Sequence, residues 1–152
     1  MKLRDKINLD ITAAMKAKEA DRLSVLRMMK SAVKNREIEK IRELDDAEVI
    51  QTLISLIKQR RDSVDQFTKG GRPELAEKEA AEIRIIEEYL PAAVGDDEIA
   101  EAVAVAIEEF GAASIKDMGK VMKACTAKFT GRPLDGAKLS ELVKAKLGGG
   151  GR

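Results

Sequence analysis

Three lysines recur at helical spacing in the last third of this chain, where their ammonium groups could bind phosphate. If the segment is an α-helix, at about 100° per residue, Lys116, Lys120 and Lys123 lie within roughly 60° of one another. The apolar side chains gather on the opposite side of the same helix: Met118, Val121, Met122, Cys125 and Phe129. One face would therefore pack on a core, and the other would be free to bind an anion. The candidate nucleic-acid-binding residues are Lys116, Gly119, Lys120, Lys123, Lys128 and Arg132.

The helix that carries these lysines is predicted to run from Ser114 to Arg132. Ser114 and Asp117 form a capping pair at its start, and Gly131, followed closely by a proline, gives the stop signal. At the centre, Gly119 costs a helix interior about 1 kcal/mol relative to alanine. The glycine therefore predicts that another helix or a ligand comes close to the backbone at this point.

A secondary basic stripe lies in the first half of the chain. Arg27, Lys30 and Lys34 recur at i, i+3 and i+7 of a predicted helix and so share one of its faces. A row of charges with no other signal is more commonly a solvated helix surface than a binding site. The stripe is therefore a second candidate, behind the C-terminal lysines.

The chain has no histidine and one cysteine, so it lacks the residues that most often carry catalysis. Without histidine neither a Ser-His-Asp triad nor a Cys-His pair can form, and a zinc site would need several Cys or His ligands. Cys125 falls on the apolar face of its helix, which indicates a core thiol. We therefore assign no catalytic residue and expect no metal and no cofactor.

One arginine interrupts an apolar stripe and calls for a partner. Arg60 lies within the apolar face of its predicted helix, and Glu79 and Glu82 lie within that of the next helix. If the chain reverses near Gly71, residue 60 lies opposite residue 82, and an Arg–carboxylate pair satisfies both charges. A pair that fixes the packing is the favoured interpretation, and an anion site is the alternative.

Charge is unevenly distributed along the sequence. Residues 1–72 hold 17 basic and 12 acidic side chains, residues 73–111 hold 2 and 12, and residues 112–152 hold 9 and 3. This pattern of two basic ends around an acidic middle can orient an anionic partner over a Debye length of about 8 to 10 Å. Aromatic residues, at 3%, leave no stacking platform for single-stranded bases. Together these features favour a folded RNA that is contacted through phosphate and ribose.

Apolar residues at helical spacing predict an all-α fold with no strand. Three of its helices have a predicted aspartate N-cap, at Asp21, at either Asp96 or Asp97, and at Asp135. The seven expected helices span about residues 3–18, 21–42, 46–70, 73–90, 96–111, 114–132 and 135–147.

The break in this pattern from Pro91 to Gly95 predicts a linker. The expected domains are an N-terminal bundle of about four helices, residues 1–90, and a three-helix C-terminal lobe, residues 96–147. The glycine-rich residues 148–152 are expected to form a flexible tail. No stretch approaches the roughly 18 apolar residues of a membrane span, and no apolar signal core is present, so we expect a cytoplasmic protein without membrane contact.

Five segments carry a resemblance to a known family. Gly119–Ala124, with the sequence GKVMKA, is similar to the core of the tail domain of the GatB subunit of tRNA-dependent amidotransferases, a module that the stand-alone YqeY proteins also carry. The resemblance implies an all-helical fold of two lobes and contact with tRNA. It supplies no catalytic residue, because other domains perform the chemistry in the amidotransferases. The remaining segments that resemble YqeY are Leu26–Met28, Lys34–Glu39, Lys58–Ser63 and Glu87–Pro91.

Three functions are open at this point. The leading hypothesis is a non-catalytic module that contacts tRNA through the lysines near residue 120. The second is an interaction module of the translation apparatus, which docks on a protein such as an aminoacyl-tRNA synthetase or an amidotransferase. The third is the activity that the family label suggests, a glutamine-dependent carbon–nitrogen ligase, for which the sequence offers no nucleophile–base pair.

Overall fold

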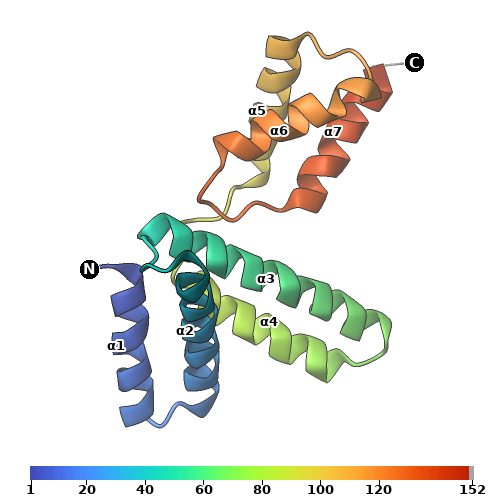
Figure 1. Ribbon diagram of the computed structural model, residues 1–152. Coiled ribbons are helices and arrows are strands. Elements are labelled where there is room, and N and C mark those ends of the chain that lie inside the picture. The colour runs from blue at the N-terminus through green and yellow to red at the C-terminus, as the bar shows by residue number, and fades with distance from the viewer. Residues whose placement is uncertain (151–152) are drawn as a thin grey trace. The chain divides into compact units, whose positions relative to one another are not determined.

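A computed structural model describes residues 1–150 of the chain, which form helices and contain no strand (Figure 1). The predicted all-α fold is confirmed. The chain divides into two compact units, an N-terminal unit, Met1–Leu90, and a C-terminal unit that begins at Pro91. The elements are α1 (Leu3–Lys16), α2 (Ala20–Lys40), α3 (Asp46–Lys69), α4 (Pro73–Glu87), α5 (Asp96–Phe110), the 3₁₀ helix η1 (Ile115–Asp117), α6 (Met118–Lys128) and α7 (Gly136–Gly150).

Two antiparallel helix pairs build the N-terminal unit. In Figure 1, α1 lies beside α2 and α3 lies beside α4, and the two pairs meet where α2 packs on α4 and α3. Short connections force each pair to be antiparallel, and the apolar faces then meet in one core. The most deeply buried side chains of this core are Ile7, Leu26, Met29, Val49, Leu53 and Ile86.

Arginine–carboxylate pairs join helices within this unit. Arg4 of α1 donates to both carboxylate oxygens of Glu37 in α2, at 2.9 and 3.1 Å. Arg22 of α2 makes the same two-pronged contact with Glu88, which follows α4, also at 2.9 and 3.1 Å. Such planar, two-bond geometry fixes the orientation of the guanidinium as well as its position. These pairs therefore set how the helices pack as well as neutralising charge.

Arg60 is held between the third and fourth helices, as the sequence predicts. Its Nη1 donates to Glu79 Oε2 at 2.7 Å and also to Glu82, so the predicted pair is confirmed with both carboxylates. The three side chains are only 16 to 21% exposed. Nη2 lies against the sulfur of Met28, and the buried Nε has no hydrogen-bond partner among the described residues. With two carboxylates on one guanidinium, the alternative of an anion site loses its support.

The C-terminal unit consists of α5, α6 and α7 around a separate core. Ile99, Val103, Val121, Leu139 and Val143 are its deeply buried side chains, each 2% exposed or less. In this small unit, apolar side chains from all three helices exclude water from one shared interior. Hydrophobic burial is therefore its main stabilising force.

The segment predicted to be a linker is attached to the C-terminal unit. Val94 is buried, and its backbone N–H donates to the carbonyl of Pro133 at 2.9 Å. Arg132 donates from Nε to the carbonyl of Ala92 at 3.1 Å and from Nη2 to that of Ala93 at 3.3 Å. Residues 92–94 are thus held by hydrogen bonds to the loop before α7, which differs from the free linker that the sequence indicates.

Helix ends differ from the sequence expectation in several places. Asp21 is not the N-cap of α2, which begins one residue earlier, after Glu19 and without a side-chain cap. Neither Asp96 nor Asp97 caps α5, because the cap position is Gly95 and its N–H donates to Glu98 at 2.9 Å. In both helices, the backbone becomes helical at or before the aspartate, so the aspartate lies inside the helix and not at the cap position. The predicted cap of α7 is confirmed, since an Asp135 carboxylate oxygen accepts from the N–H groups of residues 137 and 138.

Two helix C-termini also differ. α2 stops at Lys40 because Ile41 takes the left-handed conformation, with φ of 56°, a strained geometry for a β-branched side chain. At the other end of the chain, α7 continues to Gly150, so residues 148–150 are helical where the sequence predicts a flexible tail. Each added residue contributes a further backbone hydrogen bond to a helix that already exists, which offsets the weak helix propensity of glycine. Residues 151–152 of the expected tail lie outside the described residues.

Candidate nucleic-acid interface

The segment that carries the candidate lysines begins with a tight turn. Residues Ile115–Asp117 form the 3₁₀ helix η1, and α6 starts only at Met118. The predicted capping pair is present: Ser114 Oγ accepts from the N–H of Lys116 at 3.3 Å, and Asp117 accepts from the N–H of Ser114 at 3.4 Å. The single helix predicted from Ser114 to Arg132 is therefore two elements, because the capping pair closes a 3₁₀ turn before the α-helix begins.

The lysine face of η1 and α6 consists of Lys116, Lys120 and Lys123, and all three side chains are exposed. On the opposite side of α6, Val121 and Cys125 are 0 and 1% exposed. The ion pairs within residues 91–150 are Arg132–Glu98 and Lys138–Asp96, so no carboxylate neutralises the lysine face in this described part. Three ammonium groups on one face of the unit are thus available to an external anion.

Asp117 lies beside this face without neutralising it. Hydrogen bonds from the N–H groups of Ala113 and Ser114 lower the pKa of its carboxyl group below the ordinary value, and the charge of Lys120 lowers it further. The carboxylate is therefore occupied by the backbone at the start of η1. Its role in the structure is to cap the turn.

Gly119 is exposed and faces open space. A Cβ atom built on this residue would have no heavy atom within 4 Å, leaving aside its chain neighbours and the backbone of its own helix. The expectation that another helix approaches here is wrong for the described residues, because the packing face of α6 points elsewhere. The other possibility, an approaching ligand, is still open.

Arg132 is not part of the lysine face. Its two Nη atoms donate to the two carboxylate oxygens of Glu98, both at 2.9 Å, in addition to the two backbone carbonyls described above. This contact lowers the pKa of Glu98 to about 2. Arg132 therefore ties the segment before α5 to the loop before α7. Lys128 is exposed at the end of α6, and its Nζ lies 5.9 Å from the centroid of the Phe129 ring. It is still a candidate nucleic-acid-binding residue, next to the lysine face and outside it.

The charge of the C-terminal unit is more balanced than the sequence blocks indicate. The acidic helix α5 belongs to this unit, so residues 91–150 hold 8 basic and 9 acidic side chains. The excess of positive charge counted from residue 112 onward is therefore not the charge of a folded body. Any attraction for an anion must come from the local lysine face, since interactions beyond a Debye length of about 10 Å are screened.

In the N-terminal unit, the secondary basic stripe is split. All three side chains are exposed, but only Lys30 and Lys34 line a hollow between α1 and α2, and Arg27 does not. The stripe therefore does not act as one surface. Two of its members face a concave site, and the third faces solvent one turn away.

The remaining candidates for chemistry are structural. Cys125 is 1% exposed, and burial raises the pKa of its thiol, so the predicted core thiol is confirmed. Among residues 1–150, no group of His, Cys, Asp or Glu side chains is arranged to hold a metal ion.

No helix in this range is both long enough and apolar enough to cross a membrane.

A family model described as "Yqey-like protein" matches residues 4–147, nearly the whole chain. The chain belongs to this family. The resemblance seen in the sequence is thereby confirmed.

Curated relatives of this Yqey-like chain include proteins named "Altered inheritance of mitochondria protein 41, mitochondrial". The protein from Kluyveromyces lactis is 39% identical over 100 residues, which cover 63% of this chain and 54% of the relative. The protein from Lachancea thermotolerans is 39% identical over 82 residues, which cover 53% and 44%. The Yqey-like chain thus spans about half the length of the curated relatives that it matches.

The cytoplasmic location expected from the sequence is corrected by these relatives, whose names place them in mitochondria. The expectation relied on the absence of an apolar signal core. That absence bears on secretion alone, because mitochondrial transit peptides are amphipathic and rich in arginine.

Sequence reasoning missed two residues that the fold of the Yqey-like chain brings to the hollow between α1 and α2. Arg4 and Asn8, one turn apart on α1, line it together with Lys30 and Lys34 of α2. Neither residue belongs to a charge stripe or a motif. Only the antiparallel packing of α1 on α2 places them opposite the two lysines, so no local sequence signal identifies them.

Proposed function

We propose that this chain is a non-catalytic module that binds folded tRNA through the lysine face of η1 and α6. The observation that carries the proposal is the set of three exposed ammonium groups, at Lys116, Lys120 and Lys123, that no carboxylate of the described C-terminal unit neutralises. Lysine side chains bind phosphate as point charges and need no fixed geometry, which suits the backbone of a structured RNA.

Family membership supports the same assignment. The segment Gly119–Ala124, which resembles the tail domain of the amidotransferase subunit, forms the first part of α6 and carries two of the three lysines. Gly119 is exposed beside them, so a phosphate can approach the backbone there without meeting a side chain. The module would present tRNA to a partner enzyme and would contribute no reacting group itself.

The direct test is the affinity of the purified chain for tRNA across a series of salt concentrations. Each phosphate contact contributes a slope of about −0.7 to −0.9 to the plot of log affinity against log salt, so three contacts predict a slope of about −2 to −3. Reversing two charges with Lys120→Glu and Lys123→Glu should weaken binding by about tenfold or more and flatten the slope. Circular dichroism should show unchanged helicity, since both side chains point away from the core.

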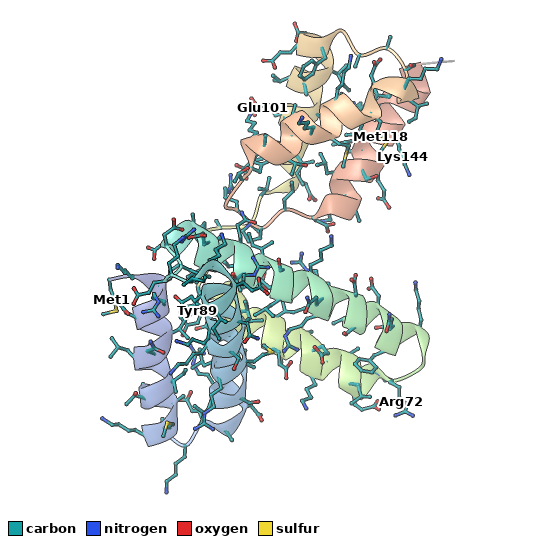
Figure 2. All side chains as sticks on the ribbon, viewed as in Figure 1. Met1, Arg72, Tyr89, Glu101, Met118 and Lys144 are labelled. Atoms are coloured by element: carbon teal, nitrogen blue, oxygen red, sulfur yellow. The ribbon has the colours of Figure 1, made fainter. Side chains whose placement is uncertain are left out.

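A matched control is available within the same unit. Lys144→Glu and Lys146→Glu make the same charge change at two exposed positions of α7 (Lys144 is labelled in Figure 2). This control should change the affinity by less than about threefold if the site is the lysine face. Equal losses from both pairs would show a diffuse electrostatic attraction and would overturn the assignment.

The second candidate function is docking on a protein of the translation apparatus. Phe110, at the end of α5, and Ile115, in η1, are 52 and 51% exposed, and Ile115 directly precedes the first lysine of the face. Binding to an aminoacyl-tRNA synthetase or an amidotransferase through these side chains would depend weakly on salt. A weakly salt-dependent complex that is lost on Phe110→Ser and kept on Lys120→Glu would favour this function over tRNA binding.

A further inference from the structure

The N-terminal unit contains a hollow that the proposed function does not use. It lies between α1 and α2, which are side by side in Figure 1, and has a volume of about 320 Å³. Small-molecule sites begin at about this volume. The apolar residues among its lining are Ile7 and Val33, which are only 1 and 5% exposed. The other lining residues are polar or charged: Arg4, Asn8, Lys30, Lys34 and Glu37.

On one side of the hollow, Arg4 and Glu37 neutralise each other in an ion pair. The carboxylate of Glu37, 6% exposed, accepts two hydrogen bonds from Arg4 and one from the N–H of Leu44 at 2.9 Å. Arg4 in turn lies within 3.6 Å of Asp5 and 3.5 Å of Glu43. The charges of Arg4 and Glu37 are therefore satisfied within the protein, and neither is available to a ligand.

The other charges of the hollow, on Lys30 and Lys34, have no direct ion-pair partner, although the charge of Lys34 helps to lower the pKa of Glu37. Lys30 and Lys34 lie one turn apart on α2 and line the hollow, and neither takes part in an ion pair within residues 1–150. Two like charges at i and i+4 repel each other, so an isolated helix does not favour this arrangement. An anion between the two ammonium groups would remove the repulsion.

One residue of the same hollow has a polar atom without a partner. Asn8 lines the hollow, and its Oδ1 is buried and accepts no hydrogen bond in the described structure. Buried carbonyl oxygens in folded proteins nearly always accept a hydrogen bond. A ligand supplies the donor once the Asn8 side chain turns this oxygen toward the hollow. The volume exceeds the roughly 30 Å³ of a single water several times over. The site therefore has room for a larger molecule that carries both an anion and a hydroxyl or N–H group.

We propose that the hollow between α1 and α2 binds a sugar phosphate, with the phosphate held by Lys30 and Lys34 and a sugar hydroxyl donating to Asn8 Oδ1. Ile7 and Val33 leave only a small apolar surface for the sugar ring, so the polar groups provide most of the binding. The same chemical unit occurs in a free sugar phosphate and at the 5′-phosphate end of an RNA. The site is in the other unit from the lysine face, so it is independent of the proposed tRNA contact.

The test uses the full chain, labelled with ¹⁵N, and titrations with ribose 5-phosphate, ribose and inorganic phosphate. Ribose 5-phosphate should shift the amide signals of residues 8, 30, 33 and 34 with saturation in the millimolar range, and ribose should not. Lys34→Gln should weaken binding by about tenfold, the loss of one charged contact. Arg27→Gln, on the same helix but outside the hollow, should leave the affinity unchanged. Equal losses from Lys34→Gln and Arg27→Gln would overturn the proposal, as would the absence of any shift.

Asn8 supplies the specificity test. Asn8→Ala should reduce the affinity for ribose 5-phosphate to that for inorganic phosphate and leave phosphate binding in place. If the wild-type chain binds both compounds equally, the role of Asn8 is wrong and the proposal fails. A 5′-phosphorylated RNA that displaces ribose 5-phosphate, where its 5′-hydroxyl counterpart does not, would identify the source of the ligand as an RNA end; a failure to displace would identify a free sugar phosphate.

Discussion

Arginine provides the cation of most inter-helix ion pairs in the N-terminal unit, whereas lysine provides seven of the eight basic side chains in residues 91–150. In the first unit, Arg4, Arg22 and Arg60 each join two helices. The C-terminal unit has one such residue, Arg132, and leaves Lys116, Lys120 and Lys123 without partners in its described part. The planar guanidinium is suited to two-bond contact with a carboxylate, and the lysine ammonium is suited to a mobile anion. Arg4, Arg22 and Arg60 thus carry structural charges in the N-terminal unit, whereas the three lysines of the lysine face carry charges that are free to bind a ligand.

The largest expected effect tests the structural role of arginine. Arg60→Ala should leave Glu79 and Glu82 close together, mostly buried and without a cation. Breaking a fully buried pair costs about 3 to 5 kcal/mol, and partial exposure lowers this to about 2 to 3 kcal/mol. Urea unfolding followed by tyrosine fluorescence measures the effect in the right unit, because Tyr89 is the one tyrosine and tryptophan is absent.

The neighbouring arginine provides the control for that experiment. Arg61 is 46% exposed, and its closest carboxylate oxygen, on Glu87, is 4.0 Å away. Arg61→Ala should therefore change the free energy of unfolding by no more than about 0.5 kcal/mol. Similar losses from both variants would show that helix propensity or net charge matters more than the pair.

Acid should weaken the arginine pairs through their carboxylates. Hydrogen bonds from Arg4 and from Arg22 lower the pKa of Glu37 and of Glu88 below their ordinary values. A carboxyl group whose pKa is lower in the folded state stabilises the fold above its unfolded pKa of about 4.5, and this stability is lost as the pH falls through the folded pKa. The urea concentration at the midpoint of unfolding, followed by tyrosine fluorescence, should therefore decrease as the pH is lowered from about 5 to about 3. Glu37→Gln should be less stable at neutral pH and should show a smaller decrease in this range.

A smaller effect of opposite sign is expected at the lysine face. Gly119→Ala places a methyl group where nothing lies within 4 Å, at a helical position without positive φ. Alanine should therefore stabilise the C-terminal unit by about 0.5 to 1 kcal/mol. The affinity of the same variant for tRNA then decides whether a ligand needs the bare backbone: more stable protein with weaker binding would give Gly119 a role in the interface.

The smallest expected effect is local. Arg132→Ala removes the hydrogen bonds to the carbonyls of Ala92 and Ala93 and the contact with Glu98, so limited proteolysis should cut residues 91–95 faster. Lys138→Ala is the control, because it removes the exposed pair with Asp96 and leaves that segment attached. Equal cleavage of both variants and the wild type would show that Arg132 does not restrain the segment.

Periodicity predicts most of this fold. Three features follow from which residues share a helix face, a property that depends on near neighbours in the sequence. They are the order of the seven α-helices, the Arg60 pair and the burial of Cys125. The 3₁₀ turn η1 before α6 is not predicted. Helix ends are less predictable. Whether Asp21 or Asp96 becomes a cap depends on backbone angles just upstream, and the left-handed Ile41 carries no signal of the kind that a glycine would give.

The candidate site also has features that local sequence predicts and features that depend on residues far apart in the sequence. Exposure of the lysine face follows from the apolar stripe behind it. The structural use of Arg132 depends on Glu98 and Ala92, 34 and 40 residues away, so local sequence cannot reveal it. The same holds for Asn8, whose position opposite Lys30 exists only once α1 packs on α2.

The burial of Cys125 has a further consequence for measuring dynamics. The chain has one thiol, and it lies at the core of the C-terminal unit, so a thiol reagent can react only when that unit opens. With fast reclosing, the labelling rate gives the free energy of that opening event, and with slow reclosing it gives the opening rate. Labelling of the unmodified chain, with and without tRNA, would thus report how strongly a ligand at the lysine face suppresses opening of the helices beneath it.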